Sequence, residues 1–121
     1  MSAVKVTKKQ LLEFDENGFV IIRKLITLNQ ATSLIKDVNR VLRGEIDLQP
    51  FGKKRVAGKV SQFANPSQHI PAWQKHTYFQ RAQHVASQLI DKLLLYKYDQ
   101  LIVKPANYLA ETHWHQDAAY W

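Results

Sequence analysis

This sequence of 121 residues contains no cysteine, which excludes disulfide bonds and metal ions bound by thiolates. It has no run approaching the ~20 apolar residues of a membrane-spanning helix. Its N-terminus alternates polar and apolar side chains and lacks the apolar stretch of a signal peptide. Any metal would therefore be held by nitrogen and oxygen atoms, and we expect a soluble, cytoplasmic protein that does not enter a membrane.

Acidic residues are in the minority: 10 Asp and Glu stand against 17 Lys and Arg, which gives a formal net charge of +7. Such an excess can indicate an anionic partner. The basic residues are scattered, however, with two local groups at positions 5–9 and 53–59, and no nucleic-acid-binding motif accompanies them. We therefore expect a solvated surface and no nucleic-acid partner.

Two helices begin with the same signal. Thr7 and Thr27 are each followed three residues later by glutamine, which is the capping-box pattern of a helix N-terminus. Gly18 and Gly44 stand where a helix commonly ends, because glycine readily adopts the left-handed conformation found there. The second helix is the clearest local prediction, since apolar residues recur behind Thr27 at three- and four-residue spacing.

The remaining elements are predicted from apolar patterns. A third, longer helix opens at Pro71 and carries apolar residues on one face as far as Leu93. β-branched and aromatic residues predict short strands at 19–22, 59–63 and 101–103. Helices that mostly precede strands indicate an α+β fold, of whose sheet these residues form only the first strands.

The most informative tripeptide is His115-Gln116-Asp117, near the C-terminus. Side chains two positions apart share a face of an extended strand, so this imidazole and this carboxylate can converge on one ion. With a third ligand, usually a histidine, such a pair forms the facial triad that suits iron(II). A His-x-Asp tripeptide also arises often by chance, and a buried His–Asp hydrogen bond is the alternative. His113 lies on the same face, as a third ligand or as a histidine at the pocket rim.

The sequence resembles the phytanoyl-CoA dioxygenase family from about residue 11 to residue 121. Residues 14–22 (FDENGFVII) are similar to the helix, glycine and strand that open the family's fold, and residues 58–63 (GKVSQF) are similar to its second conserved strand. The most specific part is residues 100–105 (QLIVKP), followed after a short loop by residues 114–121 (WHQDAAYW).

The resemblance implies a fold and an activity. N-terminal helices would frame the first strands of a double-stranded β-helix, which is a jelly-roll barrel. Iron(II) would be the cofactor and 2-oxoglutarate the co-substrate. Oxidative decarboxylation of 2-oxoglutarate to succinate and carbon dioxide would be coupled to hydroxylation of an unactivated C–H bond.

The resemblance also implies roles for five residues. His115 and Asp117 would be the first two iron ligands. Lys59 would lie near the 2-oxoglutarate, where an ammonium can pair with a carboxylate. Gln100 would line the same pocket, and Trp121 would form part of its wall.

The family's remaining histidine ligand, and the arginine that binds the far carboxylate of 2-oxoglutarate, follow the His-x-Asp motif. This sequence has no residues that match them. We therefore expect residues 1–121 to be the N-terminal part of a single dioxygenase domain, truncated after the motif and inactive alone.

Two other functions remain open on the sequence. One is a non-catalytic β-sandwich binding module that happens to contain His-x-Asp, and the other is a cupin-like metalloprotein that uses His113 with His115. For the dioxygenase we expect a monomer that acts on a small molecule. The basic residues at 53–59 favour an anionic substrate such as an acyl-CoA ester.

Overall fold

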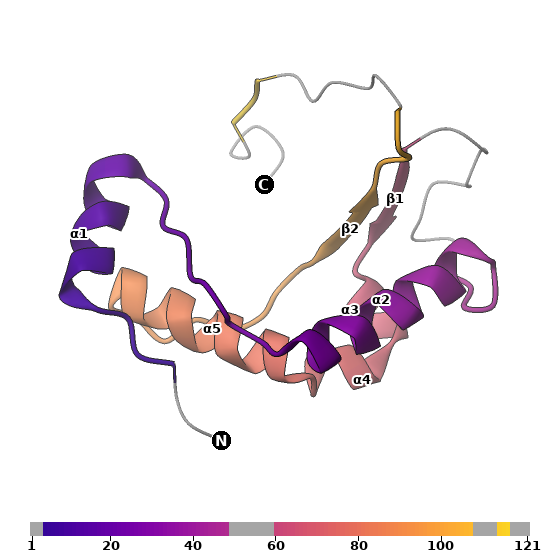
Figure 1. The fold of residues 1–121 in the computed structure, drawn as a ribbon, viewed down its shortest axis with the longest axis horizontal. Coiled ribbons are helices and arrows are strands. Elements are labelled where there is room, and N and C mark those ends of the chain that lie inside the picture. Colours follow the sequence, from indigo (N-terminus) through magenta and orange to yellow (C-terminus); the bar gives the residue numbers. More distant parts are fainter. Residues whose placement is uncertain (1–3, 49–59, 108–113, 117–121) are drawn as a thin grey trace.

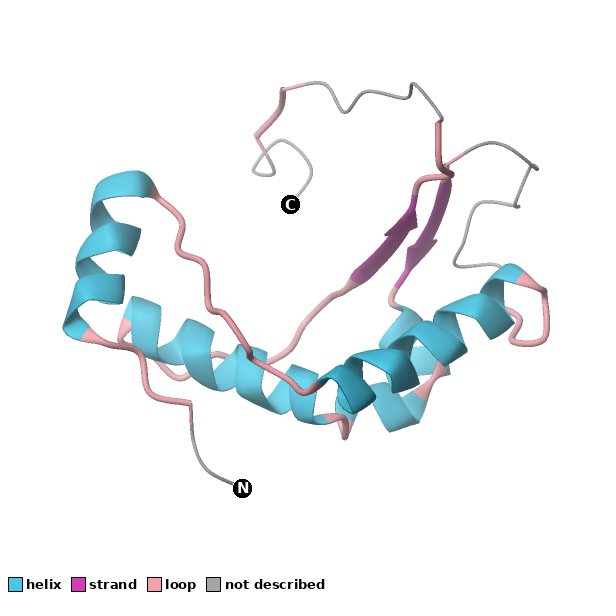
Figure 2. Cartoon of the chain, viewed as in Figure 1, coloured by secondary structure: helices cyan, strands magenta, loops and turns pink. Residues whose placement is uncertain are grey.

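The computed structural model describes residues 4–48, 60–107 and 114–116. Within them the chain forms α1 (Lys8–Asn17), α2 (Leu28–Leu42), β1 (Ser61–Ala64), α3 (Pro66–His69), α4 (Pro71–Gln74), α5 (Thr77–Ile90) and β2 (Gln100–Val103). Figure 1 shows α2 and α5 along the base of the molecule, the β1–β2 pair rising from it, and α1 at the opposite end. Helices with a small antiparallel sheet are compatible with the predicted α+β class (Figure 2). None of the described helices is both long and apolar enough to cross a lipid bilayer.

The first two helices begin and end as the sequence predicts. The hydroxyls of Thr7 and Thr27 each accept the backbone N–H of the third helical residue, and the glutamine side chain there accepts the N–H of the threonine. Gly18 ends α1 with φ 75°. After α2, Gly44 has φ 77° and donates its N–H to the carbonyl of Val41 at 3.0 Å, as in a Schellman motif.

The two strands pair antiparallel, with Phe63 opposite Leu101. Ser61 and Phe63 of β1 are buried, and Leu101 and Val103 of β2 are half-buried opposite them, while their neighbours along β2 are exposed. The sheet therefore has one inner face, which packs on the core. Both strands lie within one or two residues of their predicted positions.

The core lies where α2, β1 and α4 meet. Its buried side chains form one cluster: Val41, Leu48, Phe63, Ile70 and Trp73. The indole N–H of Trp73 donates to a carboxylate oxygen of Asp37 at 3.0 Å, so the ring is buried without an unsatisfied donor. This core fixes α4 against α2 and provides the base from which the sheet rises.

The predicted strand at 19–22 is wrong. These residues connect α1 to α2 and pair with no strand among the described residues, and Phe19 and Ile21 remain 60% and 59% exposed. A strand needs a neighbour to satisfy its backbone groups. Here the connection instead passes along α5, where Arg81 donates to the carbonyl of Leu25 at 2.7 Å (Figure 1).

The predicted long helix from Pro71 is two helices, α4 and α5, because His76 interrupts it. His76 has extended backbone angles, φ −70° and ψ 143°, and its Nδ1 accepts the N–H of Tyr78 at 3.1 Å. This side-chain cap starts α5 anew. The helix ends at Ile90, so Leu93 lies beyond it and is 83% exposed rather than part of its apolar face.

Candidate functional site

The structure describes two of the predicted site residues. Gln100 begins β2, and His115 has an exposed side chain within the short described segment 114–116. Four of the predicted positions lie outside the described residues: Lys59, His113, Asp117 and Trp121. Their placement relative to Gln100 and His115 therefore stays a prediction.

His115 fits the predicted role in its chemistry. An imidazole nitrogen is a ligand that iron(II) accepts, and the exposed side chain is accessible to a metal ion. Within the described residues, no group of three or more His, Asp or Glu side chains gathers to hold an ion. The predicted metal centre, with Asp117 outside the described residues, therefore stays a prediction.

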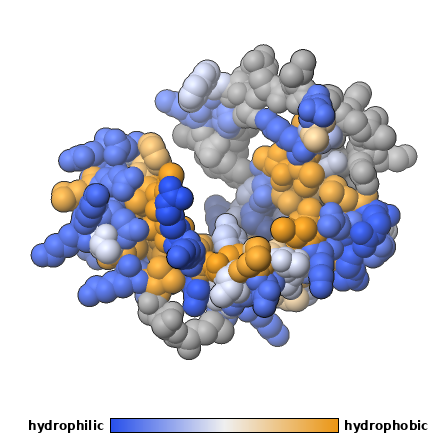
Figure 3. All heavy atoms as spheres, viewed as in Figure 1, coloured by the Kyte–Doolittle hydropathy of each residue, from blue (hydrophilic) through white to orange (hydrophobic). Residues whose placement is uncertain are grey.

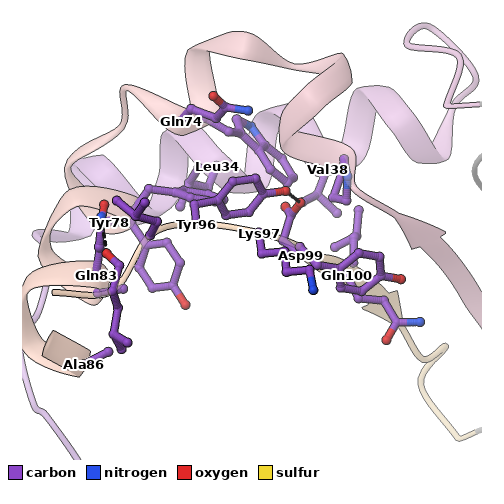
Figure 4. Close-up of a pocket in the computed structure, with 18 residues that line it drawn as sticks. Leu34, Val38, Gln74, Tyr78, Gln83, Ala86, Tyr96, Lys97, Asp99 and Gln100 are labelled. Atoms are coloured by element: carbon purple, nitrogen blue, oxygen red, sulfur yellow. Dashed lines mark hydrogen bonds between the residues drawn. The ribbon is translucent and has the colours of Figure 1, made fainter. Parts of the chain in front are cut away.

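Gln100 lines a cavity of about 820 Å³ between α2, α5 and the segment 94–101 that leads into β2 (Figure 4). Leu34 and Val38 of α2 and Phe79 of α5 give it an apolar wall. In Figure 3, hydrophobic side chains gather beside a hollow in the face of the molecule that this view shows. An apolar wall with a few polar groups is typical of a site for a small molecule.

A set of hydrogen-bonded side chains, the Asp99 cluster (Asn65, Ser67, Tyr96 and Asp99), lies against this cavity. Asp99 Oδ1 accepts the Tyr96 hydroxyl at 2.5 Å and the Ser67 hydroxyl at 3.0 Å. The Ser67 N–H donates to Asp99 Oδ2 at 3.3 Å. Ser67 has no exposed surface, so its polar groups depend on these partners.

Partial burial raises the pKa of Tyr96 above its usual value of 10.0, and the hydrogen bond to Asp99 acts in the same direction. The neutral phenol donates a hydrogen bond to the carboxylate, whereas a phenolate would repel it. Tyr96 therefore remains a hydrogen-bond donor at neutral pH.

No sequence motif marks the Asp99 cluster. The dipeptide Asn65-Pro66 signals a turn, but nothing local singles out Tyr96 or Asp99. Ser67 and Asp99 are 32 positions apart in the sequence, and only the pairing of β1 with β2 brings them together. A pattern within a single helix or strand cannot reveal a contact between residues so far apart in the sequence.

A family model described as phytanoyl-CoA dioxygenase (PhyH) matches residues 14–121 of the chain. No curated protein and no solved structure matches the chain. The matched span includes α2 to β2, the Asp99 cluster and every predicted site residue.

Proposed function

This chain belongs to the phytanoyl-CoA dioxygenase family, and we propose that it forms part of an iron(II)- and 2-oxoglutarate-dependent dioxygenase that hydroxylates a small molecule. The match over residues 14–121 is the observation that carries the proposal. It also favours this function over a β-sandwich binding module and over a cupin-like metalloprotein, because neither of these would account for the match.

His115 and Asp117 would hold the iron(II), through an imidazole nitrogen and a carboxylate oxygen. A third ligand, which the family provides as a histidine after the His-x-Asp motif, would complete the facial triad. When bound, iron(II) supplies the activation of dioxygen that no side chain can perform.

Lys59, Gln100 and Trp121 would form the pocket for 2-oxoglutarate. The ammonium of Lys59 would pair with one carboxylate of the co-substrate. The amide of Gln100, which lines the cavity, would donate a hydrogen bond to it. Apolar walls such as Leu34 and Phe79 would keep water away, and a drier site strengthens both polar contacts.

Residues 1–121 would be the N-terminal part of one dioxygenase domain, in which helices frame the first strands of a double-stranded β-helix. Exposed apolar side chains before β2 support this arrangement. Leu93 and Leu95 are 83% and 78% exposed, and further strands of a barrel would cover them.

The lining of the cavity supports a substrate with an apolar part. Most of its side chains are apolar or aromatic, and its two charged side chains, Lys97 and Asp99, have opposite signs. The proposed negative charge of the substrate therefore rests on the basic residues at 53–59. An acyl-CoA ester, or another anionic metabolite with an apolar part, combines both properties.

Release of succinate tests this function. The full-length protein, given iron(II), 2-oxoglutarate, dioxygen and a panel of acyl-CoA esters, should form succinate. Asp117→Ala should lower the rate by more than about 100-fold. Loss of a residue that only hydrogen-bonds to a metal ligand lowers activity by about 10–100-fold, and loss of a ligand itself should lower it further. Asp15→Ala, at an exposed position of α1, is the matched control and should keep the rate. Succinate formation that survives Asp117→Ala would refute the proposed site.

A further inference from the structure

The register of β1 against β2 decides where Gln100 lies. Each strand has four residues, and a two-stranded sheet of this size is marginal by itself. A slip of one residue would turn Leu101 and Val103 to the outer face, which burial opposes. A slip of two residues keeps both on the inner face, so hydrophobic burial alone opposes it only weakly.

The Asp99 cluster supplies the missing restraint. Asn65 donates its N–H to the carbonyl of Asp99 at 2.8 Å and accepts the N–H of Asp99 on its own side-chain oxygen at 3.4 Å. The Asp99 carboxylate then accepts the two hydroxyls of Tyr96 and Ser67 and the N–H of Ser67. At about 3.3 Å per residue, a two-residue slip would move Asp99 by roughly 7 Å from Asn65 and Ser67. Its contacts with these two residues would therefore be lost.

Ser67 is a fixed point for this restraint. It is 0% exposed, and its carbonyl accepts the side-chain amide of Gln74 in α4 at 3.3 Å. α4 is itself held by Trp73, which is part of the buried core. Asp99 therefore fixes β2 relative to the core, and not merely to a neighbouring loop.

We propose that Asp99 is a positioning residue, which sets the register of β2 and thereby holds Gln100 at the cavity. Figure 4 shows Asp99, bonded to Tyr96, directly before Gln100 along the cavity wall. The role of Gln100 toward 2-oxoglutarate rests on the proposed function, whereas the control of the register does not depend on it.

Pairs of introduced cysteines measure the register directly, because the sequence has no cysteine of its own. Gln62 faces Ile102, so Gln62→Cys with Ile102→Cys forms a disulfide in the observed register. Gln62→Cys with Lys104→Cys reports a two-residue slip, since diagonal partners lie about 7–8 Å apart and a disulfide needs Cα atoms closer than about 7 Å. Each pair is introduced in its own variant, and mass spectrometry after mild oxidation measures the yield of its disulfide. The ratio of the first yield to the second reports the register.

Asp99→Asn should lower this ratio about tenfold, because it replaces an acceptor by a donor that faces other donors. Asp91→Asn, the same change at an exposed position after α5, is the control and should leave the ratio unchanged. If circular dichroism shows that Asp99→Asn unfolds the chain, Tyr96→Phe removes one donor and should lower the ratio several-fold. An unchanged ratio in a folded variant overturns the proposal.

Binding of 2-oxoglutarate to the iron(II)-loaded full-length protein provides a second readout. Asp99→Asn and Gln100→Ala should each weaken binding about tenfold, and the double variant should be no weaker, because Asp99 acts through Gln100. Additive losses would overturn the positioning role. Absence of 2-oxoglutarate binding in the unsubstituted protein would instead refute the proposed function, while the disulfide ratio would still decide the register.

Discussion

The buried hydroxyl of Ser67 shows how closely the residues beside the cavity depend on one another. A buried polar group without a partner costs about 1–3 kcal/mol. The Ser67 oxygen lies 3.0 Å from a carboxylate oxygen of Asp99 and 3.1 Å from the oxygen of Tyr96. Removing Asp99 or Tyr96 therefore takes away one of the two side-chain partners of this buried hydroxyl.

Tyr96 should make stability depend on pH in the alkaline range. Its pKa in the folded state is raised by partial burial and by Asp99, so its stabilising contribution is complete below the usual value of 10.0. That contribution is lost as the pH rises through the raised pKa of the folded state. Urea unfolding between about pH 9 and pH 11 should show this loss for the unsubstituted chain, whereas Tyr96→Phe should show less of it. If stability fell equally with pH in both chains, Tyr96 would not be the source of the loss.

Among the secondary-structure elements, α1 and α2 were predictable because their signals are local. A threonine and a glutamine three residues apart satisfy the first backbone donors without help from the rest of the fold. The strand predicted at 19–22 failed for the opposite reason. β-branched residues favour an extended chain, but a strand also needs a partner, and sequence alone does not show whether one is present.

The break between α4 and α5 could not be predicted from the pattern of apolar residues. The periodicity runs through His76, yet His76 leaves the helical conformation and caps α5. The free energy of the cap, about 1 kcal/mol, is not visible in a pattern of apolar residues. The predicted single helix was wrong for this reason.

Substitution of His76 tests this cap. His76→Ala should destabilise the chain by about 1 kcal/mol, and His76→Asn should restore most of the loss, because asparagine is a good N-cap residue. Thermal or urea unfolding measures both. In a continuous helix His76→Ala would be neutral or stabilising, since alanine is the best helix former, and that outcome would contradict the cap.

Across the whole molecule, α5 ties the N-terminal half to the rest of the chain. Gln88 accepts the N–H of Val6 and donates to the carbonyl of Val4, both at 2.9 Å. Arg81 holds the carbonyl of Leu25 in the same way, where the chain passes α5 (Figure 1). The Arg81 contact keeps the α1–α2 connection beside the helix that forms one wall of the cavity, and the Gln88 contacts keep the segment before α1 beside the same helix.

The candidate site was predictable only in part. The family resemblance implies a pocket position for Gln100, and the structure shows that Gln100 lines a cavity. The iron-ligand roles that the resemblance implies for His115 and Asp117 stay predictions. Tyr96 and Asp99 were not predictable, because their role arises from strand pairing and from burial of Ser67, which no short motif encodes.

We propose that His115 and Asp117 hold an iron(II) ion to which 2-oxoglutarate also binds. Visible absorption of the full-length protein, with iron(II) and 2-oxoglutarate but without dioxygen, tests this site. We expect a charge-transfer band that His115→Ala and Asp117→Ala each abolish and that His113→Ala leaves largely intact. A folded protein without the band, or a band that persists after His115→Ala or Asp117→Ala, would contradict the claim.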